Sequence, residues 1–351
     1  MSRYRWMLAG VVAALAVAVI FTSAVRSAPP GTSTATGSAA LIPADSRMPA
    51  AGFTGLDGWL NSNPLTIGEL RGRVVLVDFW TFSCVNCVRT IPHLQHLEQA
   101  YGGKGLVIVG VHSPEFDFEK QRGNVAAAVR RLGVTWAVAL DSQMSTWNGY
   151  GNQYWPAEYL VDQAGRVAYI HDGEGDYDVT ESAVAALLGV AAAPPPAAPA
   201  PTIGAQTPEL YAGSDRGQLA DGESYGPTGQ EVSYADPGGP HDSDRIAVTG
   251  RWSDHGQYLV SSSTGHIRLS FSAHDVYAVV GPDAGSAVHL TVTVDGAAVA
   301  AEKSGPDLSP GGVTVESQQL YHLLTGESGS ARHVIDVAVP AGLRLYTFTF
   351  G

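Results

Sequence analysis

The sequence of 351 residues is long enough for two folded domains, because single hydrophobic cores rarely grow beyond about 250–300 residues. It carries 20 Lys and Arg against 33 Asp and Glu, a formal net charge of -13, and contains no Lys/Arg-rich run. This charge balance excludes nucleic acid as an expected partner. Hydrophobic residues make up 45% of the chain and charged residues only 15%, which excludes a disordered protein.

The first residues have the character of an export signal. Arg3 and Arg5 precede an uncharged apolar run over residues 7–25. A helix over this run is about 28 Å long, close to the thickness of a bilayer core, so we expect residues 1–28 to form a membrane anchor. Cleavage at the small residues 22–24 is the alternative and gives a secreted protein. In both cases the remaining chain works outside the cytoplasm.

Two segments rich in Pro, Ala, Ser and Thr divide the rest of the chain, over residues 29–49 and 191–204. The second contains Pro and Ala only over 191–201, which favours extended polyproline II of roughly 34 Å. We therefore expect two domains, over residues 50–190 and 205–351, that the linker holds apart.

Strand-like and helix-like patterns alternate through the first of these domains. The apolar run 74–80 has the length of a strand that is covered on both faces. We expect further strands over 106–111, 136–140, 157–161 and 166–171, and helices over 84–101, 117–132, 143–150 and 177–189, with Ser83 as the first N-cap. The alternation predicts an α/β domain with a mostly parallel sheet and an antiparallel hairpin at its closing edge.

The only cysteines of the sequence, Cys84 and Cys87, lie at the expected turn from the first long strand into the first helix. A helix N-terminus favours a thiolate at Cys84 through its free N–H groups and its dipole. Two sulfurs one helical turn apart can close a disulfide and open it by exchange. A metal site needs further ligands, and no second cysteine pair exists. We predict a redox-active Cys84–Cys87 disulfide, with no metal and no cofactor.

The residues around this pair resemble a known family. Val77-Asp-Phe-Trp80 followed by Cys84-x-x-Cys87 resembles the thioredoxin superfamily, and Trp155-Pro156 is similar to its cis-proline site. Segments 80–93, 111–116 and 149–156 resemble the extracytoplasmic part of the DipZ cytochrome c biogenesis proteins, a branch of the TlpA-like thiol:disulfide oxidoreductases. The resemblance runs from about residue 50 to residue 351 and implies a thioredoxin-like fold. DipZ proteins also carry a multi-span CcdA-like electron carrier, whereas this chain has one apolar segment.

The residues and the resemblance predict the same roles. Cys84 attacks and Cys87 resolves. Asp78 is a carboxylate in an apolar strand, so burial should raise its pKa and let it exchange a proton with Cys87; the alternative is an ordinary hydrogen-bonding residue at the strand end. Pro156 holds the backbone of Trp155 beside the sulfurs, where an extended substrate can pair with it. Trp80 and Trp155 are expected to pack around the disulfide and to contact substrate, with structural packing alone as the alternative.

Two acidic features lie outside the cysteine motif, at Glu115 and over residues 171–178. Glu115 is either a residue near the site or an exposed loop carboxylate, and we expect the exposed loop carboxylate. Residues 171–178 lack the spacing of a calcium loop and are expected to form a solvated acidic turn.

The second domain has a strand period of two and no long helix. Apolar and polar residues alternate over 266–271, 289–294, 335–339 and 346–350, and Asp295-Gly296 predicts a tight hairpin. We expect an all-β, jelly-roll-like sandwich, and the resemblance implies a carbohydrate-binding-module-like fold. We expect packing rather than sugar stacking for the aromatic residues Trp252, Tyr258, Tyr277 and Tyr321. The seven scattered histidines predict no metal site: His241, His255, His266, His274, His289, His322 and His333.

These observations predict a membrane-anchored thiol:disulfide oxidoreductase that acts on extracytoplasmic disulfide-containing proteins. The dipeptide Val85-Asn86 leaves the redox potential open, and the resemblance to TlpA-like proteins favours a reductant, with a CcdA-type membrane carrier as its electron source. One alternative is a binding module for envelope glycan or protein with a subsidiary redox domain. A peroxidase is the other, suggested by Thr81-x-x-Cys84, although Val77 stands where the peroxiredoxin pattern has proline.

Overall fold

The computed structural model describes residues 41–193, 206–236, 241–326 and 331–351. The predicted membrane anchor and most of the predicted linkers lie outside these residues. Within the described ranges, no helix is both long and apolar enough to cross a bilayer.

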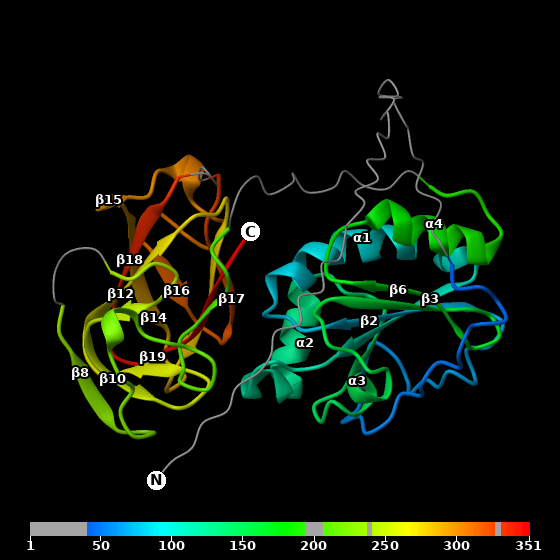
Figure 1. The fold of residues 1–351 in the computed structure, drawn as a ribbon, viewed down its shortest axis with the longest axis horizontal. Helices are drawn as coiled ribbons and strands as arrows, with labels where there is room; N and C mark the ends of the chain where they lie inside the picture. Colours follow the sequence, from blue (N-terminus) through cyan, green and yellow to red (C-terminus); the bar gives the residue numbers. More distant parts are fainter. Residues whose placement is uncertain (1–40, 194–205, 237–240, 327–330) are drawn as a thin grey trace, which may run out of the picture. The chain divides into compact units, whose positions relative to one another are not determined.

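The first domain is built on one mixed sheet of six strands in the order β1-β4-β3-β2-β5-β6 (Figure 1). The strands are β1 Trp59–Leu60, β2 Val74–Trp80, β3 Leu106–His112, β4 Ala137–Leu140, β5 Ala157–Val161 and β6 Val167–Asp172. The helices are α1 Val85–Tyr101, α2 Arg122–Arg131, α3 Ser145–Gly149 and α4 Tyr177–Leu188, with short 3-10 turns at η1 Gly102–Lys104 and η2 Asp117–Lys120. The thioredoxin-like α/β fold predicted from the sequence is confirmed.

The sequence predicted a mostly parallel sheet, but most strand pairs are antiparallel. β2 pairs in parallel with β3, and β3 with β4, but β1–β4, β2–β5 and β5–β6 are antiparallel in the described sheet. The reason is the path after β4, since the chain passes α3 and enters β5 from the opposite end of the sheet. The predicted helix 117–132 is also divided, into η2 and α2, at Gln121.

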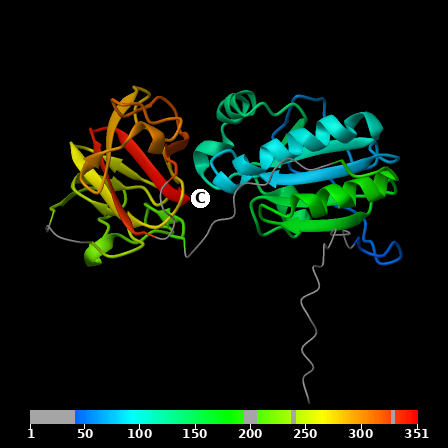
Figure 2. The same ribbon diagram turned by 90° about the horizontal axis from the view of Figure 1, so that it is seen from above.

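β2 is buried along its whole length, as the apolar run predicted. Val74, Leu76 and Trp80 belong to a core cluster that includes residues of α1, α2 and α4. Val75, Val77 and Phe79 face a second cluster with Trp147 of α3. Figure 1 shows α1 and α4 over one face of the sheet, and Figure 2 shows them side by side from above. The central strand is therefore fixed on both faces.

Residues 41–49, predicted as linker, lie against the end strand β6. The N–H of Ile42 donates to the carbonyl of Ala168 at 2.8 Å, and Pro49 forms a β-bridge with Arg166. Arg47 adds an ion pair with Asp162 at 3.0 Å. This segment therefore belongs to the packing of the first domain.

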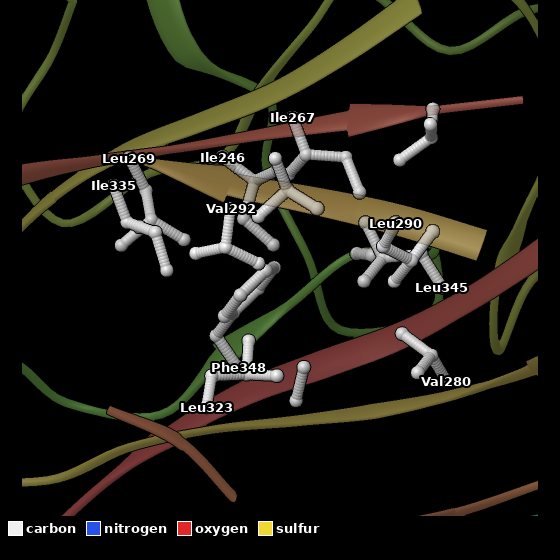
Figure 3. Close-up of a cluster of buried hydrophobic side chains, with 14 of the residues drawn as sticks. Ile246, Ile267, Leu269, Val280, Leu290, Val292, Leu323, Ile335, Leu345 and Phe348 are labelled. Carbon is white, nitrogen blue, oxygen red and sulfur yellow. The ribbon is translucent and has the colours of Figure 1, made fainter. Parts of the chain in front are cut away.

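The second domain consists of two antiparallel sheets that face each other across a hydrophobic core (Figure 3). One sheet has the order β17-β13-β19-β11-β10-β8, with β7 beside β19, and the other has β15-β14-β18-β12-β9, with β16 beside β14. The strands are β7 Leu210–Tyr211, β8 Glu231–Tyr234, β9 Ala247–Val248, β10 Gly250–Asp254, β11 Leu259–Ser261, β12 Gly265–Phe271, β13 Val276–Pro282, β14 Val288–Val294, β15 Ala297–Ala298, β16 Val313–Val315, β17 Gln319–Leu324, β18 His333–Val339 and β19 Leu343–Phe350. Two 3-10 turns complete it, η3 Ala220–Gly222 and η4 Ala301–Lys303. The predicted hairpin at Asp295-Gly296 joins β14 to β15.

The sandwich contacts the α/β domain, contrary to the expected separation by an extended linker. The described residues of both domains belong to one compact unit. A register shift between β13 and β19 leaves Tyr346 between the paired positions Leu345 and Thr347. Such a bulge redirects a side chain, and Tyr346 packs against Phe116 and Phe118 of the α/β domain at ring distances of 5.2 and 4.7 Å.

Candidate active site

The two cysteines lie at the start of α1. Cys84 is the N-cap, with φ -79 and ψ 119, and its sulfur accepts a hydrogen bond from the N–H of Cys87 at 3.4 Å. Cys84 is partly exposed, whereas Cys87 is 2% exposed. Both are free thiols. The site thus presents one sulfur toward solvent and keeps the other inside the fold.

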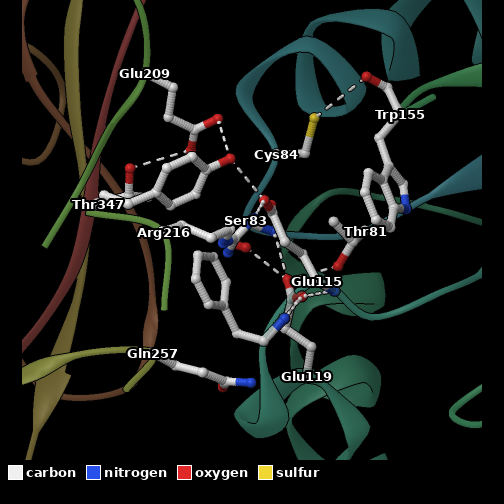
Figure 4. A network of polar contacts seen from close by, with 12 residues as sticks. Thr81, Ser83, Cys84, Glu115, Glu119, Trp155, Glu209, Arg216, Gln257 and Thr347 are labelled. Atoms are coloured by element: carbon white, nitrogen blue, oxygen red, sulfur yellow. Dashed lines mark hydrogen bonds and ion pairs between the residues drawn. The ribbon is translucent and has the colours of Figure 1, made fainter. Parts of the chain in front are cut away.

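The sequence predicted Ser83 as the N-cap of this helix, and this prediction was wrong. The hydroxyl of Ser83 instead donates to Glu119 at 2.6 Å, and its N–H donates to the same oxygen at 3.3 Å. The hydroxyl of Thr81 donates to this oxygen at 2.5 Å, while the N–H groups of Glu115 and Phe116 donate to the other one (Figure 4). The buried Glu119 therefore ties the segment before Cys84 to the segment after β3.

Asp78 lies on β2 below the thiol pair and is 3% exposed. Burial raises the pKa of its carboxyl well above the usual range, and the charge of Glu158 raises it further. Burial and the hydrogen bond with Cys84 raise the pKa of the Cys87 thiol, and the charge of Asp78 adds to this. The carboxyl and the buried thiol both resist ionisation, and the charge of Asp78 acts on Cys87.

The bond between Trp155 and Pro156 is cis, as predicted. The Cys84 thiol points to the carbonyl oxygen of Trp155 at 3.9 Å (Figure 4), and the indole N–H of Trp155 donates to the carbonyl of Ser113 at 3.0 Å. Trp80 was predicted to lie around the disulfide and contact substrate. It is 2% exposed and packs edge-on against His112, so its ring supports the core and offers no surface to a substrate.

The expectation that Glu115 is an exposed loop carboxylate was wrong. Its side chain is 11% exposed and forms an ion pair with Arg216 of the sandwich at 2.6 Å. Tyr211 donates to the same carboxylate at 2.9 Å, and its hydroxyl is also bonded to Glu209, whose pKa burial raises to about 7 (Figure 4). The guanidinium of Arg216 covers the ring of Tyr211. Glu115 therefore joins the two domains close to the thiol segment.

Arg89 connects the residues between the cysteines to a more distant loop. It donates to the side chain of Asn86 at 2.9 Å and to both oxygens of Glu174 at 2.8 and 2.5 Å. Glu174 belongs to the segment predicted as a solvated acidic turn. The structure shows instead that part of this turn is paired with the first helix.

The aromatic residues of the sandwich pack as expected. Trp252, Tyr277 and Tyr321 are 1%, 8% and 3% exposed, so their ring faces are not available for a sugar. Tyr258 is partly buried and stacks on His255 at 5.1 Å. Among the described residues, no group of His, Cys, Asp or Glu has the arrangement of a metal site.

Sequence reasoning missed Glu119, Arg89 and Glu158 as parts of the site. Glu119 and Arg89 follow ordinary helical patterns and carry no signal of their own. Glu158 did carry one, because it is a carboxylate within the apolar strand Ala157–Val161, which is the same signal that identified Asp78.

Two known protein families match the chain, one for each domain. Residues 43–188 match the family described as Redoxin, and residues 207–351 match the family described as Thioredoxin like C-terminal domain. The chain is 38% identical to Protein DipZ of Mycobacterium bovis over 319 residues, which cover 86% of this chain and 43% of that protein. Protein DipZ of Mycobacterium tuberculosis gives the same values. The chain thus spans less than half the length of these relatives.

Shorter relatives match less than half of the chain. Thiol-disulfide oxidoreductase YkuV of Bacillus subtilis is 27% identical over 143 residues, which cover 40% of this chain and 95% of YkuV. A solution structure of a thioredoxin-like protein in the oxidized form is 26% identical, with a TM-score of 0.38, and covers 41% of this chain and 96% of that protein. Each domain thus matches its own family, and one continuous match to Protein DipZ covers 86% of the chain, so the chain is similar to the DipZ-type thioredoxin-like thiol:disulfide oxidoreductases.

Proposed function

We propose that this protein is a thiol:disulfide oxidoreductase that exchanges electrons through Cys84 and Cys87 with disulfides of extracytoplasmic proteins. The observation that carries the proposal is the arrangement of the pair. Cys84 caps α1 and is partly exposed, while Cys87 is buried with its N–H pointing at the Cys84 sulfur. The carboxyl of Asp78 provides a proton acceptor next to the buried thiol.

In the reducing direction, the Cys84 thiolate attacks one sulfur of the substrate disulfide. A mixed disulfide forms and the other substrate sulfur leaves as a thiolate. Asp78 takes the proton of Cys87, and the Cys87 thiolate attacks the Cys84 sulfur, which releases the second substrate thiolate. The substrate gains two electrons, and Cys84 and Cys87 lose them as their disulfide forms.

The Trp155 carbonyl next to Cys84 gives an extended substrate segment an acceptor for a backbone hydrogen bond. A peroxidase is less well supported, because Thr81 is fully buried and its hydroxyl is bonded to Glu119. Glycan binding is also less well supported, because the rings of Trp252, Tyr277 and Tyr321 are buried.

The trapping experiment tests this chemistry directly. Cys87→Ser leaves Cys84 without its resolving partner, so mixed disulfides with substrate proteins should accumulate and disappear on reduction. Cys84→Ser should trap nothing and should abolish reduction of insulin. Equal trapping by both variants would contradict the assignment of attacker and resolver.

We further propose that the apolar run over residues 7–25 anchors the protein in the membrane and that a CcdA-type carrier supplies its electrons. Arg3 and Arg5 before the run support this orientation. Deletion of that carrier should convert the thiol pair to the disulfide in cells, as read by an alkylation gel shift. A pair that is fully oxidised with and without the carrier would indicate an oxidant.

A further inference from the structure

Asp78 faces two other titratable side chains across the sheet. It lies directly opposite Glu158 in the antiparallel pairing of β2 with β5, and Glu158 lies directly opposite His171 in the pairing of β5 with β6. Opposite residues in a sheet point to the same face with their Cβ atoms roughly 5 Å apart. The three side chains therefore form one row from the central strand to the last strand of the sheet.

Only the last member of this row reaches the surface. Asp78 and Glu158 are 3% and 1% exposed, whereas His171 is partly exposed. A proton that Asp78 receives from Cys87 cannot pass directly to solvent, because Asp78 lies beneath α1 and α4 in the buried face of the sheet. The row leads from this enclosed position toward the edge.

Each member of the row keeps a polar atom free of other partners. Oδ1 of Asp78, Oε1 of Glu158 and Nε2 of His171 are buried and have no hydrogen-bond partner among the described residues. The second oxygen of Glu158 is held by the hydroxyl of Thr180 from α4 at 3.0 Å. An unpaired buried carboxyl oxygen is costly, so its retention in two adjacent residues calls for a functional reason.

We propose that Glu158 is a proton-relay residue and that the row Asp78–Glu158–His171 conducts the proton between Cys87 and solvent. This inference rests on the proposed function. Asp78 takes the proton from the Cys87 sulfur and passes it to the Glu158 carboxylate. Glu158 passes it to the imidazole of His171, which releases it to water, and no other bond forms or breaks. Reduction of the Cys84–Cys87 disulfide runs the same transfers in reverse.

The environment of the row suits reversible transfer. Burial raises the pKa of Glu158 to about 7, so its carboxyl can hold or release a proton near neutral pH. The other titratable groups around the row are Cys87 and His93 from α1, Tyr169 from β6 and Tyr177 from α4. His93 stacks on Tyr177, and burial lowers its pKa to about 4, so at neutral pH it is uncharged and does not compete for the proton.

The test separates the step that needs the relay from the step that does not. The reduced full-length protein is mixed with dithiobis(nitrobenzoate), which releases one coloured thiolate when Cys84 attacks and a second when Cys87 resolves. In Glu158→Gln the amide cannot accept a proton and nearly keeps the volume. We expect the second release to slow about tenfold at neutral pH, less than the roughly 100-fold lower limit for loss of a direct acid or base. The first release should stay within about twofold of wild type.

The pH profile gives a signature that mere loss of structure would not produce. The slowing in Glu158→Gln should be greatest above about pH 7, where the wild-type carboxyl is ionised and can accept a proton, and should disappear near pH 5, where that carboxyl is already protonated. Glu181→Gln is the matched control, because Glu181 is a carboxylate of α4 that is 1% exposed and bonded to Tyr101 outside the row. Both releases of this variant should match wild type. If Glu158→Gln does not fold, His171→Asn must slow the second release alone.

A second release with an unchanged rate and pH profile in Glu158→Gln would overturn the relay and leave the proposed function standing. Equal slowing of both releases in Glu158→Gln and Glu181→Gln would also overturn it, because that points to general loosening of the domain. Absence of a second release in the wild-type protein would overturn the proposed function itself.

Discussion

The contact between the domains can be tested at Tyr346, the residue that the β19 bulge directs onto the α/β domain. Its side chain is 1% exposed, and its ring lies 5.2 Å from Phe116 and 4.7 Å from Phe118. Its hydroxyl accepts a hydrogen bond from Gln318 at 2.8 Å. Because these partners come from both domains, truncation of Tyr346 should weaken the contact between them.

The expected loss follows from the burial of the ring. Removal of a fully buried large aromatic side chain costs about 3–5 kcal/mol. The hydrogen bond from Gln318 accounts for about 1 kcal/mol of this. Tyr346→Phe should therefore lose about 1 kcal/mol and Tyr346→Ala about 3–5 kcal/mol of the free energy of unfolding. Tyr154→Ala is the control, since Tyr154 is 52% exposed and should change the value by less than about 0.5 kcal/mol.

Urea unfolding followed by tryptophan fluorescence gives these free energies, and calorimetry shows whether the domains unfold together. Chains with two domains can unfold in separate steps once the contact between the domains is lost. We expect the calorimetric transitions of Tyr346→Ala to lie further apart than those of the wild type. A loss below about 1 kcal/mol in Tyr346→Ala, similar to that of Tyr154→Ala, would show that the ring is not buried between the domains in solution.

Three further outcomes follow from the site. Because burial raises the pKa of Glu158 from its usual 4.5 to about 7, the neutral form favours the folded state. This stabilisation is complete below pH 4.5 and is lost as the pH rises through about 7. The free energy of unfolding of the wild type should therefore fall by about 3 kcal/mol over this range, whereas that of Glu158→Gln should not. Urea unfolding at both ends of the range measures the difference. Glu119→Ala leaves the buried hydroxyls of Thr81 and Ser83 without their acceptor and should cost about 3–5 kcal/mol in thermal or urea unfolding, with Glu119→Gln closer to wild type. Arg89→Ala removes a cation that is bonded to Asn86, between the two cysteines, and should lower the reduction potential of the pair by on the order of 10 mV in glutathione buffers, whereas no change would mean that Arg89 acts only on Glu174.

The site was predictable where one short segment holds the information. The apolar run of β2 and the two cysteines after it were enough to predict the strand, the start of the helix and the burial of Asp78. Glu119 was not predictable, because its role depends on the turn that divides the expected helix 117–132 at Gln121. That turn brings the Glu119 carboxylate onto Thr81 and Ser83, which also removes Ser83 from its predicted position as N-cap.

The contact between the domains was missed for a different reason. The strand β13, Val276–Pro282, is buried at every position, which is the pattern that identified β2 as covered on both faces. One face of β13 belongs to the sandwich core, while Val279 belongs to the same cluster as the core of the α/β domain. The sequence of β13 is therefore apolar without alternation, which indicates a strand that is covered on both faces. The prediction missed this because the neighbouring strands alternate between apolar and polar residues.

The pairing of Asp78 with Glu158 shows what a strand pattern leaves open. Each residue is a carboxylate in an apolar strand, but only the register of β2 against β5 places them opposite each other. A shift of one residue would turn Glu158 to the other face of the sheet, where Phe79 and Tyr159 pack. The burial that makes Asp78 a proton acceptor also separates it from water, so a buried acceptor needs a neighbour that can pass the proton on. In the proposed relay the sheet register supplies that neighbour, from a strand far from the thiol pair in the sequence.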